Sequence, residues 1–79
     1  MGQKPRRDTV LLREIAAKLR RIRKELGKSQ VDAYIDTEIH VGRVESGRTN
    51  ISISTLSALC DYYGISLGNF FSDIPSKKP

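Results

Sequence analysis

The sequence predicts an all-α fold, a compact domain of five helices. Apolar residues recur at three- and four-residue steps along most of the chain, as they do on the buried face of a helix. Gly27, Gly47 and Gly64 divide the chain into short segments, and Ser or Thr stands before several of these. β-branched residues never alternate long enough to predict a strand. A chain of 79 residues forms one small domain, in which a single core supplies only a few kcal/mol.

The first helix is expected over residues 10–25, with Thr9 as its N-cap and Gly27 just beyond its end. Its buried face is expected to carry five aliphatic residues: Leu12, Ile15, Leu19, Ile22 and Leu26. Four basic residues are expected to point elsewhere around it: Lys18, Arg20, Arg21 and Lys24. The helix therefore separates an apolar face from a basic face.

Two short helices are expected next. Ser29 is placed to cap a second helix over residues 30–35. The chain then restarts into a third helix over residues 38–46, which Gly47 ends. The apolar positions of the third helix are Ile39, Val41 and Val44.

The last two helices follow a loop over residues 48–51. Ser52 is placed to cap the fourth helix, and Gly64 stops it. Its inner face is expected to carry Leu56, Leu59, Cys60 and Tyr63. Ser66 opens a final short helix that ends at Phe71. Residues 9–73 are thus the expected folded domain, between a flexible basic arm (1–8) and a solvated tail (74–79).

The charge is unevenly distributed along the chain. Residues 1–30 carry 10 Lys and Arg against 3 acidic residues, whereas residues 31–79 carry 4 against 6. A basic half favours a polyanionic partner. The single Cys excludes an internal disulfide framework and favours a reducing compartment.

Several classes of protein are excluded by what the sequence lacks. One His and one Cys cannot build a structural zinc site. No segment approaches the roughly 20 apolar residues of a membrane span, and the start has no apolar core of a signal peptide. We therefore expect a cytoplasmic protein without metal or cofactor. No catalytic arrangement is present, so an enzyme is not expected.

An ordered series of short motifs indicates a family. They are Arg23 four before Gly27, Ser29-Gln30, Val41 with Arg43-Val44-Glu45-Ser46-Gly47-Arg48, Asn50, Ser52-Ile53, Thr55-Leu56, Gly64-Ile65-Ser66-Leu67 and Phe70-Phe71. Together they resemble the phage-repressor-like (Cro/repressor, XRE-type) helix-turn-helix family of small bacterial and phage transcription regulators. The resemblance covers about residues 19–71. It implies five helices around a small core and binding of double-stranded DNA.

The sequence departs from the family pattern at one place. Gln30 and Glu45 stand about three residues closer together than the matching residues of most members, and the Gly common in the turn is missing. Three residues is close to one helical turn. We therefore expect the second helix to be about a turn shorter, which leaves the start of the recognition helix undefined.

Arg43 is the foremost candidate for reading a base, because Arg bidentate to guanine is the commonest specific contact; a phosphate contact is the alternative. Glu38 either accepts from a cytosine amino group or simply favours the helix dipole. His40 either touches a base or phosphate or stays solvated. Thr37 either caps the third helix or contacts phosphate.

Four more residues are expected to hold the DNA backbone. Gln30 at the start of the second helix matches a phosphate-binding position of the family, although an exposed Gln with a capping role is the alternative. Ser46, Arg48 and Asn50 are the others, and Asn50 also suits a turn. Gly42 inside the third helix indicates a close approach either to the second helix or to DNA.

The resemblance also implies an ion pair between Arg23 and Glu45 that orients the recognition helix. Aromatic and aliphatic residues concentrate near the C-terminal end, and half-sites on DNA are read by two-fold dimers. We therefore expect a homodimer through the last helix, with Leu67, Phe70 and Phe71 at the interface.

The expected function is a sequence-specific transcriptional regulator, a repressor that binds an inverted-repeat operator as a dimer. A DNA-binding antitoxin that also captures a toxin protein is the alternative, and a restriction–modification controller is a further subtype. A pure interaction module is disfavoured by the joint presence of Gln30, Arg43, Arg48 and Asn50.

Overall fold

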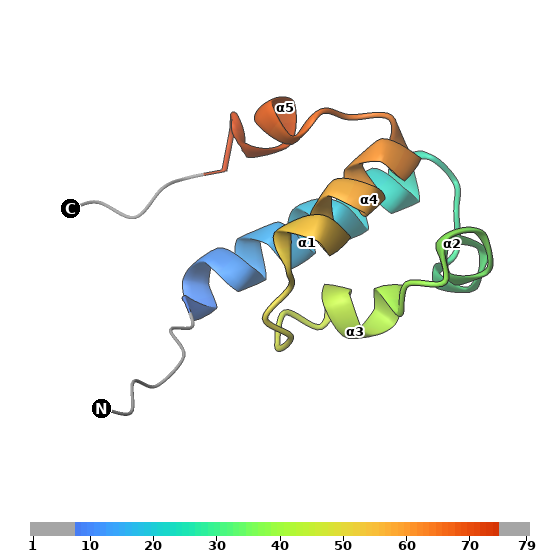
Figure 1. The fold of residues 1–79 in the computed structure, drawn as a ribbon, viewed down its shortest axis with the longest axis horizontal. Helices are drawn as coiled ribbons and strands as arrows, with labels where there is room; N and C mark the ends of the chain where they lie inside the picture. The colour runs from blue at the N-terminus through green and yellow to red at the C-terminus, as the bar shows by residue number, and fades with distance from the viewer. Residues whose placement is uncertain (1–7, 75–79) are drawn as a thin grey trace.

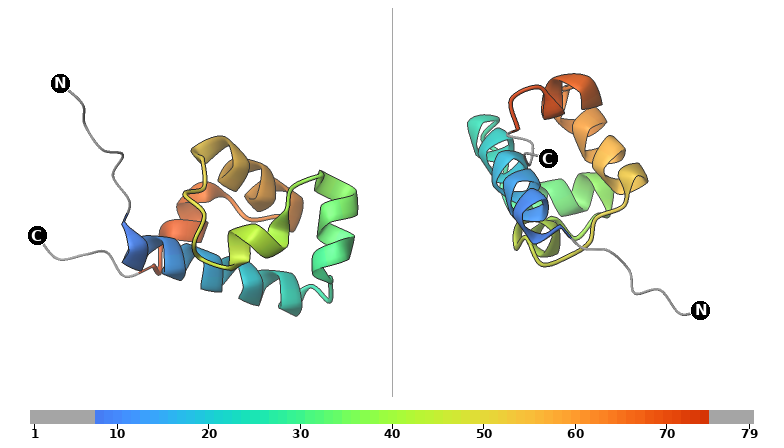
Figure 2. Two further views of the ribbon diagram at one scale, coloured as in Figure 1. Left: turned by 90° about the horizontal axis from the view of Figure 1, so that it is seen from below. Right: turned by 90° about the vertical axis from the view of Figure 1, so that its left-hand side faces the viewer.

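The computed structural model describes residues 8–74, and over that range it contains five helices and no strand. They are α1 (Thr9–Glu25), α2 (Gln30–Thr37), α3 (Val41–Glu45), α4 (Ile53–Tyr63) and α5 (Leu67–Phe71) (Figure 1). The predicted all-α, five-helix fold is therefore confirmed. α3 lies against the long α1, α4 packs against α2 and α5, and α2 stands at the far end of the molecule from the start of α1 (Figures 1 and 2).

Hydroxyl and carboxylate side chains begin most of the helices. Ser29, Ser52 and Ser66 cap α2, α4 and α5, each accepting a hydrogen bond from the backbone N–H three residues further on. The N-cap of α1 is Asp8 rather than Thr9, and its carboxylate accepts from the Leu11 N–H at 3.0 Å. A carboxylate also benefits from the positive end of the helix dipole, so the folded domain begins one residue before the predicted boundary.

The core lies between α1, α3, α4 and α5, and Phe70 is the fully buried side chain of α5. Leu19, Leu59 and Phe70 are among its most buried members, each with 1% or less of its surface exposed. Ala33 contributes from α2. Ile74 is half-buried and packs against this core, so the solvated tail does not begin there as predicted. The remaining residues of the expected arm and tail, 1–7 and 75–79, lie outside the described range.

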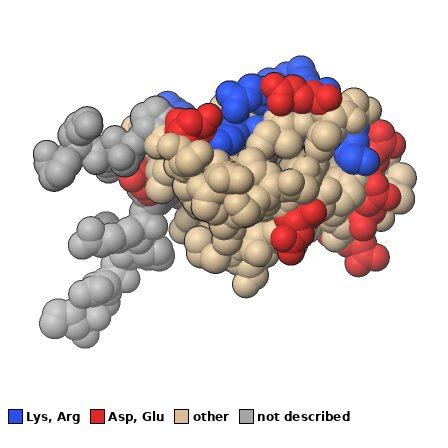
Figure 3. Space-filling view, turned by 90° about the horizontal axis from the view of Figure 1, so that it is seen from above, with Lys and Arg blue, Asp and Glu red and all other residues tan. Residues whose placement is uncertain are grey.

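The basic residues of α1 differ in their surroundings. Arg20, Arg21 and Lys24 are exposed, as expected, and Lys and Arg side chains gather along one edge of the molecule (Figure 3). Lys18 is the exception, because 8% of its surface is exposed. The prediction that Lys18 points away from the core was wrong.

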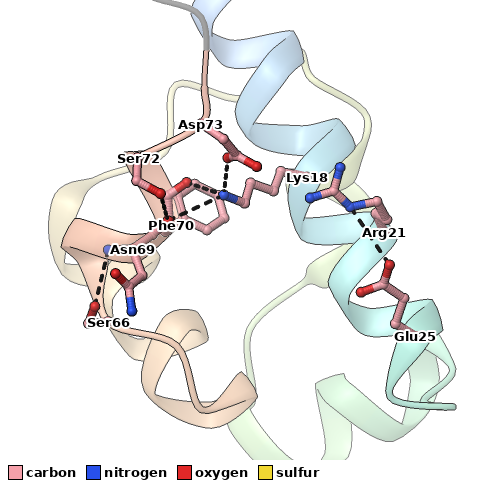
Figure 4. A network of polar contacts seen from close by, with 8 residues as sticks. All are labelled: Lys18, Arg21, Glu25, Ser66, Asn69, Phe70, Ser72 and Asp73. Carbon is pink, nitrogen blue, oxygen red and sulfur yellow. Dashed lines mark hydrogen bonds and ion pairs between the residues drawn. The ribbon is translucent and has the colours of Figure 1, made fainter.

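Lys18 holds the C-terminal end of the domain against α1 (Figure 4). Its Nζ donates to the Phe70 carbonyl and to the Asp73 carboxylate, the latter at 2.5 Å. It also lies 3.4 Å from the Asn69 carbonyl oxygen and 5.0 Å from the centroid of the Phe70 ring. The hydrogen bond from Lys18 lowers the pKa of the Asp73 carboxyl. The ammonium thus satisfies the Phe70 carbonyl near the C-terminal end of α5.

The boundary between the second and third helices differs from the prediction. α2 has eight residues and continues to Thr37, whereas α3 has only five and begins at Val41. Glu38 ends α2 in the left-handed region with φ 61°, a conformation that glycine adopts more easily. The third helix is therefore the one that is shortened, at its start. The expectation that the second helix would be shortened was wrong, because α2 continues to Thr37.

No helix in residues 8–74 has both the length and the apolar character needed to cross a membrane.

Candidate nucleic-acid interface

A bidentate ion pair ties the end of α3 to α1. Arg23 Nε lies 2.7 Å from one carboxylate oxygen of Glu45, and Nη2 lies 3.0 Å from the other. The two side chains are 7% and 2% exposed. Arg23 Nη1 also donates to the Lys28 carbonyl at 2.7 Å. The hydrogen bonds to Glu45 raise the pKa of Arg23. With α1 as the frame, this pair fixes the direction in which α3 points.

Gln30 joins the same network from the start of α2. Its Nε2 donates to a Glu45 carboxylate oxygen at 3.0 Å. Gly42 makes room for this amide, because a Cβ on Gly42 would lie 3.1 Å from Gln30 Oε1. Gly42 is therefore explained by a close approach to α2. The Gln30 side chain is exposed, and its second amide hydrogen and its backbone N–H are unused by this contact, so it can still donate to an anion.

The two faces of α3 differ in polarity. Val41 and Val44 are buried in the core, whereas Gly42 and Arg43 are exposed on the opposite side. The guanidinium of Arg43 has no ion pair within residues 8–74. A free, exposed guanidinium on a helix that is otherwise anchored is well suited to a bidentate contact.

His40 is the N-cap of α3 and is exposed. Its ring stacks on the exposed ring of Tyr34 from α2, with centroids 5.0 Å apart and planes inclined by 29°. A shallow hollow of about 370 Å³ runs between the two helices, and Gln30, Tyr34, His40 and Arg43 border it. Three of the predicted DNA-binding residues therefore meet at one surface.

Polar contacts close the loop after α3. The Ser46 hydroxyl donates to the Arg43 carbonyl at 2.6 Å and accepts from the Arg48 N–H at 3.2 Å. The Thr49 hydroxyl donates to the same carbonyl at 3.3 Å. Gly47 takes φ 75° and packs against Arg13 of α1. The backbone that carries Ser46 and Arg48 is thereby held beside α3 and α1.

Other predicted residues lie elsewhere. The Thr37 hydroxyl donates to the Ala33 carbonyl at 2.7 Å and accepts from the Ile39 N–H at 3.1 Å, so Thr37 closes α2 and does not cap α3. Glu38 ends α2 and is not a helix-start residue of α3, which removes the favourable dipole expected for it. Asn50 is exposed and borders a different hollow of about 290 Å³, together with Phe71.

The three residues expected at a dimer interface are unequally placed. Phe70 has 0% of its surface exposed and belongs to the core of the monomer, so it has no surface to offer a partner. Leu67 and Phe71 are half-buried. Phe71 lines the hollow of about 290 Å³, which Leu11 and Ile53 also border.

Sequence reasoning missed Tyr34 as a member of the site. Tyr34 is not among the residues predicted for the site, yet 44% of its surface is exposed. Tyr34 and His40 are six residues apart, which is not a helical repeat. Their rings meet because the tight turn at Glu38 brings them together. Only knowledge of that turn could have revealed the pair.

Two helices joined by a tight turn, with the second anchored by an ion pair and exposing polar side chains, define a helix-turn-helix DNA-binding domain. A family model described as "Helix-turn-helix" matches residues 19–70, which is more than half of the chain. The chain belongs to this family, the XRE-type, phage-repressor-like helix-turn-helix proteins, which are DNA-binding regulators. A search of curated proteins and a search of solved structures returned no match.

Proposed function

We propose that the protein is a sequence-specific transcriptional repressor that binds an inverted-repeat operator as a homodimer and has no catalytic activity. The single observation that carries this proposal is the unpaired, exposed Arg43 on a helix whose orientation is fixed by the Arg23–Glu45 pair. An exposed cation that the fold positions but does not use is available for an external partner. We place the protein in the bacterial cytoplasm, bound to the nucleoid, where operator DNA is found.

Base reading is assigned to the N-terminal end and outer face of α3. Arg43 donates to guanine O6 and N7 in the major groove, and His40 is placed beside it to reach a neighbouring base edge. Tyr34 supports the His40 ring through their stacking. Glu38 and Thr37 are assigned only to the edge of this surface, because both belong to the end of α2.

Backbone contacts are assigned to the residues that flank α3. Gln30 donates to a phosphate from the start of α2, and Arg48 donates from the loop after α3. The Ser46 hydroxyl, whose one hydrogen is held by the Arg43 carbonyl, exchanges that bond for a phosphate when DNA binds. Asn50 follows in the same loop. Hydrogen bonds within the loop hold its backbone in place before DNA arrives, which lowers the entropy that ordering it would cost.

The homodimer is proposed to form at the end of the molecule where α5 meets the starts of α1 and α4. Phe71 is half-buried, and Ile53 has 68% of its surface exposed. Both border the same hollow of about 290 Å³. An exposed apolar surface of this kind favours an interface. Leu67 remains a candidate beside them.

The test is selection of bound duplexes from a random library at about 0.15 M salt, which suppresses non-specific binding. We expect enrichment of an inverted repeat whose half-site centres are about 10 base pairs, one helical turn, apart. Arg43→Ala is expected to cost about 1–3 kcal/mol on that site and to relax preference at one base pair. Arg48→Ala is expected to weaken all sequences alike. The absence of any enriched sequence would refute the proposal.

A toxin-binding antitoxin is the second candidate, and one observation favours it. The outer face of α2 exposes Val31 (64%) and Ile35 (66%), one helical turn apart. Val31 also borders the hollow of about 370 Å³ beside Arg43, whereas Ile35 does not. An exposed apolar residue away from the DNA-binding surface favours a protein partner. Co-purification of a toxin with the wild-type protein and its loss from an Ile35→Asp variant that still binds DNA would establish this function. A restriction–modification controller is a subtype of the first candidate.

A further inference from the structure

The outer face of α1 carries a stripe of three basic residues. Arg13, Arg20 and Lys24 recur at steps of seven and four residues, which places them on one side of the helix. All three are exposed. Ala17 occupies the position between Arg13 and Arg20 on the same side and is also exposed. We call Arg13, Arg20 and Lys24 the α1 basic stripe.

The α1 basic stripe adjoins the proposed DNA-binding surface directly. A hollow of about 510 Å³ lies between α1 and the end of α3, bordered by the three stripe residues together with Ser46 and Gly47. A second hollow of about 400 Å³ is bordered by Arg20, Gln30, Gly42 and Ser46. Arg20 therefore borders the same surface as two residues assigned to phosphate, so the stripe adjoins that surface.

The loop that follows α3 lies against Arg13 of α1. A Cβ on Gly47 would lie 3.5 Å from Arg13 Cγ and 3.6 Å from Arg13 Cα. This close approach places the loop with Ser46 and Arg48 against the start of the stripe. A duplex held by that loop would present further phosphates along α1.

The charges of the stripe are not neutralised by ion pairs within the described part of the chain. No ion pair within residues 8–74 involves Arg13, Arg20 or Lys24. Glu45 is the acidic residue that borders both hollows, but its carboxylate is already engaged by Arg23. Like charges one turn apart destabilise a helix by a few tenths of a kcal/mol. An outer face used only for solubility usually intersperses acidic partners, whereas this stripe has Ala17 in their place.

We propose that the α1 basic stripe binds the phosphate backbone of duplex DNA that flanks the segment contacted by α3; this proposal rests on the DNA binding proposed above. Eleven residues separate the ends of the stripe, so it spans about 16 Å at 1.5 Å per residue. One DNA strand presents about five phosphates over that length. The stripe thus extends each protomer's contact beyond the bases that α3 can reach.

The test is the salt dependence of binding, measured by fluorescence anisotropy on a labelled duplex between about 0.05 and 0.3 M salt. Each phosphate contact contributes about 0.9 to the slope of log K against log salt. The triple variant Arg13→Ala/Arg20→Ala/Lys24→Ala is expected to lose about 2–3 units of slope and to lose affinity equally for all sequences. Lys28→Ala is the control for charge, because Lys28 lies over the Tyr62 ring of α4; its slope is expected to stay at the wild-type value.

A second readout uses the length of the DNA. The wild-type protein is expected to gain affinity when the duplex is lengthened by about five base pairs beyond the selected site, and the triple variant is expected to gain none. Should the triple variant fail to fold, as judged by its circular dichroism melt, Arg20→Ala and Lys24→Ala alone are each expected to lose about 0.9 units of slope.

An unchanged slope in a folded stripe variant would overturn the inference and leave the proposed function standing. Failure of the proposed function alone can also be recognised. Since the slope can be measured on random-sequence duplexes, a loss of slope in the absence of any selected operator would support the stripe and refute sequence-specific repression.

Discussion

Loss of Arg23 should be among the most damaging single changes in this protein. Arg23→Met would leave the Glu45 carboxylate, only 2% exposed, with the Gln30 amide as its remaining partner. Two charge-assisted hydrogen bonds of 2.7 and 3.0 Å would be lost, each worth roughly 1.5–3 kcal/mol. Breaking one side of a buried pair costs about 3–5 kcal/mol. A domain of this size has about 4–12 kcal/mol of stability in all.

The assay is urea unfolding followed by circular dichroism at neutral pH. We expect Arg23→Met to lose about 4 kcal/mol of unfolding free energy, which makes the domain marginally stable. Glu45→Met should cost less, because the Arg23 guanidinium retains its bond to the Lys28 carbonyl. The double variant Arg23→Met/Glu45→Met should be more stable than Arg23→Met alone, since no charge is then left stranded.

The double-mutant cycle decides whether this reasoning is correct. If the two single losses simply add in the double variant, the two side chains do not interact energetically. A loss below about 1 kcal/mol for Arg23→Met would likewise refute the claim, because such a value is typical of an exposed pair.

Three further changes test other parts of the structure. Tyr63 has a buried hydroxyl without a partner in residues 8–74, and burial raises its pKa from 10.0 to about 12. The unfolded chain therefore loses this proton at a lower pH than the folded protein does. The unfolding free energy should fall as pH rises from 10 toward 12. Tyr63→Phe should reduce that fall in urea unfolding at pH 7 and 11, with the rest coming from Cys60 and Tyr62, whose pKa values are also raised. It should raise stability at pH 7 by about 1 kcal/mol. Lys18→Met should lower the unfolding free energy by about 2 kcal/mol. Lys18 lowers the pKa of Asp73, so the wild-type protein loses stability as Asp73 takes up a proton below pH 3.8. Lys18→Met should remove this part of the loss, and unchanged acid denaturation would contradict the role of Lys18. Gly42→Ala should raise the melting temperature slightly, because the helix gains up to about 1 kcal/mol while the exposed end of Gln30 can move aside; a lower melting temperature would show that the amide is held rigidly.

The helix ends marked by Ser and Gly were the most predictable part of this fold. Ser29, Ser52 and Ser66 cap helices where the sequence places them, and Gly27, Gly64 and Gly47 adopt positive φ. These outcomes depend on a few neighbouring atoms, namely a side-chain oxygen that reaches a free N–H or the absence of a Cβ.

Features that depend on distant segments were not predictable in the same way. Lysine usually lies at the surface, and the burial of Lys18 depends on carbonyl groups 51 and 52 residues later in the chain. The start of α3 depends on Glu38 adopting a left-handed conformation without being glycine, which local propensity disfavours. Phe70 and Phe71 are adjacent, and only the packing of α5 determines that Phe70 is the one fully inside the core.

The brevity of α3 limits how much sequence information one protomer can extract. Five residues measure about 7.5 Å, which matches about two base pairs at roughly 3.4 Å each. Two specified base pairs occur by chance about once in 16 positions, and two such half-sites together about once in 256, among the 10⁶ or more competing sites of a genome. If α3 is the recognition helix, a dimer that relied on it alone would find on the order of thousands of equivalent targets. Discrimination must then depend on the distance between half-sites and on the flexibility of the DNA between them, so that operators for this protein would be defined more by geometry than by length of matched sequence.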